Sequence, residues 1–274
     1  MKVNNMFSNA SGQSTTSTPR IASLNIAIGN LLPPFEWVEI PGGKVTLEAG
    51  GSLSKATTFD VLTFTIAKYP ITNAQFEMFA NSPSGYDSPK WWEFSDAAKK
   101  WHAQNPKPKK RAFPEDDHPR ANVSWYEAIA FCCWLTGIVA SEGSLSPLGA
   151  EFALPTEQQW QRAAQGDDRR AYPWGNEFDT KKANTSEGKI GKTTLVTQYP
   201  QGASPYGVCD MSGNVYEWCL TRWETGTSDL ETTGVRVLRG GSFHYRQSRA
   251  TATFRYALDP FRRYDYFGFR VAVA

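Results

Sequence analysis

The segment between Asp210 and Glu217 holds the residues whose types and spacing are best suited to bind a metal ion. It reads DMSGNVYE, so a glycine can bend the chain and bring oxygen atoms together. The available oxygen ligands are the carboxylates of Asp210 and Glu217 and the carbonyls of Gly213 and Val215. Hard oxygen ligands suit Ca²⁺ rather than zinc. The spacing therefore predicts a calcium site in this segment.

Glu217 also has a second possible partner. It stands between two large aromatic residues in a strand-like run, where a carboxylate is costly to bury unless it is paired. An arginine of the same chain could take the place of the cation. The candidates are Arg239, Arg255 and Arg270. The sequence leaves both interpretations open.

The C-terminal segment 237–272 combines two ordered frames, VLRGGSF and GFRVA, with an irregular insert between them. Tyr, Phe and Arg accumulate in the insert without the period of a core strand or helix. Tyr and Phe supply contact area with few rotatable bonds, and Arg adds planar hydrogen bonding. These types indicate a ligand-binding surface, with packing as a loop core as the alternative. The candidate contact residues are Phe243, His244, Tyr245, Arg246, Gln247, Arg249, Phe254, Tyr256, Leu258, Phe261, Arg262, Tyr264, Asp265, Tyr266 and Phe267.

The starts of three helices are predicted from the same sequence motif, the capping box. Thr72, Ser124 and Thr156 are each followed three residues later by Gln or Glu and then by an apolar helical face. Gly137 and Gly166 stand where two of these helices are expected to end. A further short helix is expected to carry Trp91, Trp92 and Trp101.

Strands are expected around these helices. The alternation on both sides of Pro41-Gly42-Gly43 predicts a hairpin, and residues 60–68 have the β-branched alternation of a single strand. No repeat and no Gly/Ser-rich linker divides the chain. We therefore expect a polar, disordered tail at 1–20 and one α+β domain at 21–274.

Composition limits the classes of function. The net charge of +2 is too small to indicate a nucleic-acid partner. No apolar run approaches the roughly 18 residues of a membrane-spanning helix, and the N-terminus lacks the apolar core of a secretory signal. The four cysteines are expected to be reduced, buried thiols. These observations predict a cytoplasmic protein without membrane insertion.

Eight motifs, in order, give the chain a recognisable resemblance. They are YPITNAQFEMF, HPRANVSWYEAIAFCCWL, LPTEQQWQRAAQG, YPWGNEF, ANTSEG, SPYGVCDMSGNVYEW, VLRGGSF and GFRVA. Together they resemble the formylglycine-generating enzyme (sulfatase-modifying factor) family from about Phe35 to the C-terminus. The resemblance implies the family's version of the C-type lectin fold, with mixed sheets, few helices and long irregular loops.

The resemblance also implies metal sites. One calcium ion would fall on Asn184 and Thr185, although Lys189-Ile190-Gly191-Lys192 replaces the acidic segment that completes this site in the family. The other would fall on the segment 210–217 described above.

Two positions depart from the family's oxidase pattern. Tyr245 and Ala250 stand where the family has the cysteines that bind copper, so copper chemistry is not expected. A related iron-dependent branch takes metal histidines from an added helical domain. Here His102, His118 and His244 have no such spacing, and no iron is expected. On these grounds we expect a protein that is not an enzyme.

The segment 237–272 further resembles that of the variable proteins of diversity-generating retroelements, in which scattered positions are replaced by adenine-directed mutagenesis. This resemblance implies a non-catalytic protein that binds a protein or other macromolecular ligand. Two alternatives stay open: an oxygen-using modifying enzyme with an altered active site, and an inactive paralogue that assembles with a true modifying enzyme.

Overall fold

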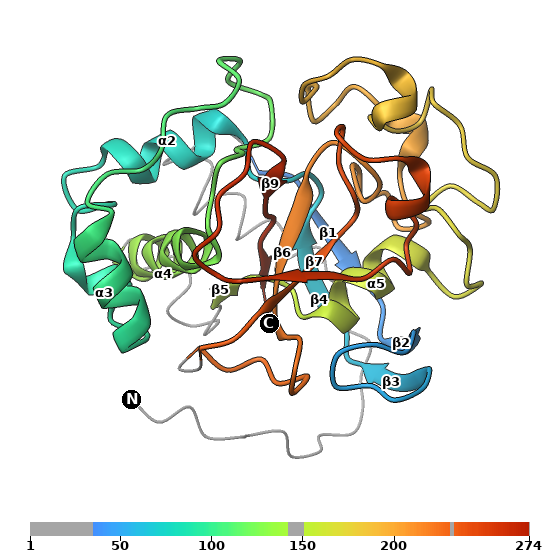
Figure 1. The fold of residues 1–274 in the computed structure, drawn as a ribbon, viewed down its shortest axis with the longest axis horizontal. Helices are drawn as coiled ribbons and strands as arrows, with labels where there is room; N and C mark the ends of the chain where they lie inside the picture. The colour runs from blue at the N-terminus through green and yellow to red at the C-terminus, as the bar shows by residue number, and fades with distance from the viewer. Residues whose placement is uncertain (1–34, 142–150, 231–232, 274) are drawn as a thin grey trace.

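The computed structural model describes residues 35–141, 151–230 and 233–273. The tail expected at 1–20 lies outside the described residues. Two four-stranded sheets and a two-stranded ribbon form the β-structure of the described ranges. Short helices pack around them, and long irregular loops connect them (Figure 1). This arrangement confirms the expected α+β class.

The first sheet has the strand order β1-β4-β10-β5 and is antiparallel throughout. Its strands are Trp37–Ile40 (β1), Phe64–Ala67 (β4), Ala272–Val273 (β10) and Phe152–Ala153 (β5). The C-terminal strand thus lies between strands from the first two-thirds of the chain. The ribbon pairs Gly43–Leu47 (β2) with Thr57–Val61 (β3).

The second sheet, of order β8-β7-β6-β9, carries the C-terminal segment. Its strands are Tyr216–Arg222 (β6), Arg236–Arg239 (β7), Tyr256–Leu258 (β8) and Phe267–Gly268 (β9). β6 pairs antiparallel with β7 and parallel with β9, which places Tyr216 opposite Phe267 and Glu217 opposite Gly268. The sheet is therefore mixed.

The helices lie on two sides of the sheets (Figure 1). Asn73–Asn81 (α2), Asp96–Gln104 (α3) and Trp125–Ser141 (α4) gather on one side, and Glu157–Gln165 (α5) lies on the other. Four 3₁₀ turns are also described: Pro89–Trp92 (η1), Ser186–Gly188 (η2), Pro200–Gly202 (η3) and Gln247–Arg249 (η4). None of the described helices is long and apolar enough to cross a membrane.

The capping boxes are confirmed. The Thr72 and Thr156 hydroxyls accept from the backbone N–H three residues on, and Gln75 and Gln159 accept from the cap N–H in return. Ser124 and Glu127 make the same exchange at the start of α4. Each box satisfies backbone donors that the first helical turn leaves unpaired.

Gly137 does not end α4, contrary to expectation. The helix continues to Ser141. A Cβ atom at Gly137 would lie 2.4 Å from the Trp91 ring, so the glycine allows this indole to approach the helix. Gly166, in contrast, ends α5 with a φ of 70° as expected.

Three other local predictions are wrong. The strands flanking Pro41-Gly42-Gly43 do not pair with each other, because β1 joins β4 and β2 joins β3. Residues 60–68 form two strands rather than one, with Leu62 67% exposed between them. The tryptophan-rich helix is split into η1 and α3, where the Ser95 side chain caps a new start.

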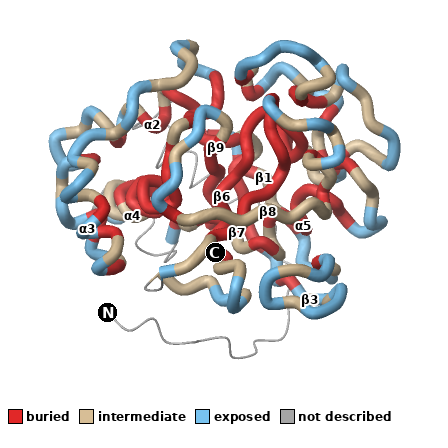
Figure 2. The backbone as a smooth tube through the Cα atoms, in the orientation of Figure 1, coloured by how far each residue is buried: buried red, intermediate tan, exposed pale blue. Residues whose placement is uncertain are grey.

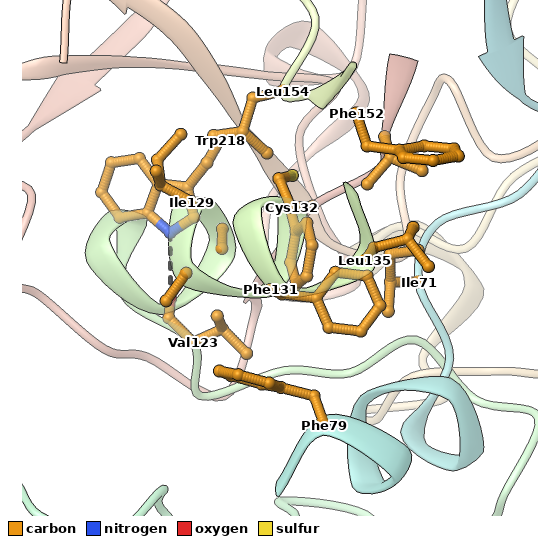
Figure 3. Close-up of a cluster of buried hydrophobic side chains, with 14 of the residues drawn as sticks. Ile71, Phe79, Val123, Ile129, Phe131, Cys132, Leu135, Phe152, Leu154 and Trp218 are labelled. Atoms are coloured by element: carbon orange, nitrogen blue, oxygen red, sulfur yellow. Dashed lines mark hydrogen bonds between the residues drawn. The ribbon is translucent and has the colours of Figure 1, made fainter. Parts of the chain in front are cut away.

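The main hydrophobic core lies between α4, α2 and the sheets (Figure 3). Phe131 contacts Phe76, Phe79 and Trp134 with ring centroids 5.6–5.9 Å apart. Trp218 of β6 is fully buried, and its indole N–H donates to the Val123 carbonyl at 2.9 Å. This core fixes β6, the strand on which the site is built.

Candidate ligand-binding site

Glu217 is paired with Arg270 in the interior of the protein. Both side chains are fully buried, and the Arg270 Nε and Nη2 atoms each donate to a different Glu217 oxygen at 2.6 Å. The Trp160 indole N–H donates to Glu217 Oε2 at 2.7 Å. This bidentate pair ties β6 to the segment after β9. Of the three arginines that the sequence allowed, Arg270 is the partner.

The other two arginines converge on Glu157 at the start of α5. Arg255 makes two bonds of 2.7 Å to its carboxylate, and Arg239 makes one of 3.2 Å. Arg239 also donates to the Ala252 carbonyl at 2.7 Å. Both arginines belong to the segment 237–272, so this buried cluster anchors the start and the middle of the segment to α5.

The segment 210–217 is closed by its own side chains. Asn214 donates from Nδ2 to Asp210 Oδ2 at 2.8 Å, and both residues have positive φ. Burial raises the pKa of the Asp210 carboxyl to about 7, which the Asn214 hydrogen bond partly opposes. Because Arg270 engages both Glu217 oxygens, this conformation offers neither to a cation. Calcium at Asp210, Gly213, Val215 and Glu217 stays a prediction.

Asn184 and Thr185 lie beside that segment. The Asn184 carbonyl accepts from the Asn214 backbone N–H at 2.8 Å, and its Nδ2 donates to the Lys192 carbonyl at 2.9 Å. Its Oδ1 is buried without a partner among the described residues, as a cation ligand would be. The described ranges contain no group of three His, Cys, Asp or Glu residues placed to hold a metal ion. A calcium ion at Asn184 and Thr185 likewise stays a prediction.

The candidate contact residues divide by exposure. In Figure 2, β8 is of intermediate burial and lies next to the buried strand β7, its neighbour in the sheet. The exposed candidates are His244, Arg246, Phe261, Arg262, Tyr264 and Asp265. The partly buried ones are Tyr245, Gln247, Arg249, Phe254, Tyr256, Leu258 and Tyr266. Phe243 and Phe267 are buried and support the others from beneath.

The exposed and partly buried rings form a continuous stack. His244 stacks on Tyr266 with centroids 5.2 Å apart, and Tyr266 stacks on Tyr264 at the same distance. Tyr245 meets Tyr266 edge-on at 5.5 Å. The stack joins the loop after β7 to the loop before β9. We call His244, Tyr245, Tyr264 and Tyr266 the ring stack.

Beside the ring stack, Arg249 lies over aromatic faces. Its guanidinium carbon is 4.7 Å from the Tyr245 ring centroid, 5.7 Å from Phe254 and 6.0 Å from Tyr256. Below it, the fully buried Tyr216 ring contacts Tyr245 and Tyr256 at 5.6 and 5.4 Å. Tyr216 was missed as a site residue. Its position between Val215 and Glu217 in a strand could have placed it on the opposite face from Glu217.

The surface continues past Phe261 into a pocket of about 420 Å³. Phe261 is 48% exposed and lines it together with Trp101 of α3 and Tyr126 of α4. Nothing in the sequence pattern connects α3 with the C-terminal segment. Arg263 makes this connection, since it pairs with Glu127 at 2.6 Å and lies 4.4 Å over the Trp101 ring.

The fold and the sequence motifs together assign the chain to a protein family. The chain belongs to the family of sulfatase-modifying factor enzyme 1-like domains, whose model matches residues 32–274. It is 29% identical over 248 residues to hercynine oxygenase of Mycolicibacterium smegmatis, covering 79% of this chain and 54% of that protein. It is 27% identical over 277 residues to the formylglycine-generating enzyme of Bos taurus, covering 80% and 69%. The chain thus spans about half the length of the oxygenase.

A solved structure confirms the fold. Treponema denticola variable protein 1 superposes with a TM-score of 0.64 at 22% identity, over 88% of this chain and 95% of that one. The fold is the C-type lectin fold of the formylglycine-generating-enzyme type, as the motifs implied.

The expectation that this protein is not an enzyme is wrong. It rested on Tyr245 and Ala250, but relatives that match most of the chain are named as enzymes. Two missing cysteines bear on one thiol chemistry only. In the structure, Ala250 is fully buried and its carbonyl accepts from the Ser212 hydroxyl at 2.7 Å, while Tyr245 is part of the ring stack.

Proposed function

We propose that this protein binds a macromolecular ligand through the ring stack and the neighbouring residues 243–267. The observation that carries the proposal is the ring stack itself, with Tyr264 37% exposed at its outer end. Amphipathic rings that are held in place give large contact areas at low entropic cost. Rings of this kind, next to arginine, are typical of interface hot spots.

The way in which the surface is held supports the proposal. The Tyr264 carbonyl accepts from the Asn122 N–H at 2.9 Å, and the Pro260 carbonyl accepts from the Trp125 N–H at 3.0 Å. Arg263 adds its ion pair with Glu127. These contacts fix a loop without regular structure to the start of α4. A surface that is ordered before it meets a ligand loses less entropy on binding.

We further propose that this surface is diversified by a retroelement. The fold shared with a variable protein and the composition of the insert support this step. The test is to sequence the gene's neighbourhood and its 3′ end in many isolates. A reverse-transcriptase gene and a near-copy of the 3′ segment, differing at adenines, are expected. Substitutions should fall on exposed positions such as His244 and Tyr264 and spare Phe243 and Arg270. Substitutions spread equally over buried positions would contradict the proposal.

A second candidate is an oxygen-dependent modifying activity, which the similarity to hercynine oxygenase favours. Its test is incubation with hercynine, a thiol, ferrous iron and isotopically labelled O₂, followed by mass spectrometry. Labelled oxygen in a product would support this candidate activity. Recovery of unchanged hercynine would exclude the oxygenation of hercynine as the function.

A further inference from the structure

Arg249 differs from the buried arginines of the same segment in having no carboxylate partner. Arg239 and Arg255 pair with Glu157, Arg263 with Glu127, and Arg270 with Glu217. Arg249, although partly buried, makes no ion pair with any described residue, and its guanidinium lies over the rings of Tyr245, Phe254 and Tyr256. A partly buried guanidinium without a carboxylate partner is well placed to receive an anion through charge-assisted hydrogen bonds.

The charges near Arg249 do not neutralise it. Glu187 contacts the chain two residues before Arg249, where its two oxygens accept from the Gln247 backbone N–H at 3.0 and 3.2 Å. Glu187 also accepts from the Thr185 hydroxyl at 2.7 Å, and the Arg246 charge contributes to lowering its pKa. Glu187 is therefore engaged by Thr185, Gln247 and Arg246, and the Arg249 charge is left to face the aromatic cluster.

A second polar group points to the same place. The Tyr216 hydroxyl is buried and has no partner with hydrogen-bond geometry among the described residues. Burial raises the pKa of the Tyr216 phenol, and the Arg249 guanidinium, which lies within interaction distance of the hydroxyl, partly opposes this rise through that contact and through its charge. The Arg249 charge acts on the pKa of the Tyr256 phenol in the same sense. Buried polar atoms without partners are uncommon in folded proteins, so this one calls for an explanation.

We propose, on the basis of the ligand-binding function above, that Arg249 and the Tyr216 hydroxyl form an anion subsite that takes a carboxylate of the ligand carried next to an apolar or aromatic group. The planar guanidinium matches a carboxylate, and a charge-assisted hydrogen bond is about twice as strong as a neutral one. The rings of Tyr245 and Tyr256 would enclose the apolar part. The class of ligand is thus an acidic one, such as a peptide with a carboxylate beside an aromatic side chain.

The test compares benzoate with benzamide, which have similar shape but differ in charge. Each is titrated into the full chain, and the NMR signal of the Arg249 Nε–H group is followed. The signal is assigned by its loss in Arg249→Lys. Benzoate should shift it and bind at least about tenfold more tightly than benzamide, and added salt should weaken benzoate alone.

Variants locate the site. Arg249→Gln should lower benzoate affinity to about that of benzamide, and Tyr216→Phe should lower it by about threefold. Arg169→Gln is the matched control, because Arg169 is exposed and contacts Thr46 of β2. The affinity of this variant for benzoate should stay within about twofold of wild type. The comparison of benzoate with benzamide is made on the wild-type protein, so it remains valid even if a variant fails to fold.

Two outcomes would overturn the subsite. Equal binding of benzoate and benzamide at the ring stack would remove the anion preference and leave the proposed ligand-binding surface standing. If neither probe moves the Arg249 signal, the subsite is also overturned. The proposed ligand-binding surface is tested separately, by cross-linking to a ligand.

Discussion

At the scale of single residues, Glu217 and Arg270 form a buried ion pair in the interior. Both side chains are fully buried, and Arg270 also donates to the Cys209 carbonyl at 2.9 Å. Removing one partner of a buried pair leaves the other charge without compensation, which costs about 3–5 kcal/mol. Glu217→Gln keeps the shape of the side chain and should lower the free energy of unfolding by this amount in urea denaturation.

The control is an exposed pair in the ribbon. Lys44 and Asp60 lie 2.8 Å apart, with side chains 72% and 80% exposed. Asp60→Asn should change the free energy of unfolding by less than about 1 kcal/mol, since solvent screens such pairs. If the two variants were equally stable, the central role of the Glu217 pair would be wrong.

Calcium can be tested at the same scale. An ion bound only by the folded state stabilises it by about 2.7 kcal/mol at a concentration one hundred times its Kd. The melting temperature should therefore rise with added calcium and fall with a chelator, and Asp210→Asn should reduce the difference. A melting temperature that is the same with calcium and with chelator would show that neither proposed site binds the ion.

At the scale of elements, the packing of Trp91 against α4 requires a glycine. Alanine is favoured over glycine in a helix by about 1 kcal/mol. The added methyl group of Gly137→Ala would nevertheless overlap the Trp91 ring, whose nearest atom is 2.4 Å away. Overpacking costs about 1–3 kcal/mol, so we expect a net loss of stability.

Gly188→Ala is the matched control for this prediction. A Cβ atom at Gly188 would meet nothing within 4 Å. Its free energy of unfolding should stay within about 0.5 kcal/mol of wild type. A more stable Gly137→Ala protein would show that the contact with Trp91 is unimportant.

Helices and strands were predictable from the sequence where the interactions that determine them are between residues close in the chain. The capping boxes at Thr72, Ser124 and Thr156 involve residues three apart, and all three helices begin where expected. Strand pairing was not predictable, because β1 pairs with β4 from a distant part of the sequence rather than with the adjacent β2. Gly137 was misinterpreted for the same reason, since its role depends on Trp91.

The candidate site was predictable only in part. Composition identified the C-terminal segment as the candidate binding surface, but it did not predict how deeply each of its residues is buried. Phe243 and Phe267 have the same types as the exposed positions, yet both are buried. The partner of Glu217 was one of three open choices, and only the pairing of β6 with β9 brings Arg270 to it.

At the scale of the whole molecule, a rigid interior supports an irregular surface, and stability should separate the two. Trp218→Ala should cost about 3–5 kcal/mol, because the indole is fully buried and hydrogen-bonded to Val123. Tyr264→Ser should cost less than about 1 kcal/mol, since the ring is partly exposed at the end of the ring stack. Guanidinium denaturation of both variants measures this difference. Equal losses would mean that the ring stack is core.

The central claim, that the ring stack binds a ligand, is tested most directly by photo-cross-linking in cells of the source organism. Tyr264 is replaced by a benzophenone-bearing phenylalanine, and Leu62, which is 67% exposed between β3 and β4, receives the same group as the control. We predict a discrete cross-linked species from position 264 that Tyr266→Ser weakens, and none from position 62. The same products from both positions, or no product from position 264, would contradict the claim.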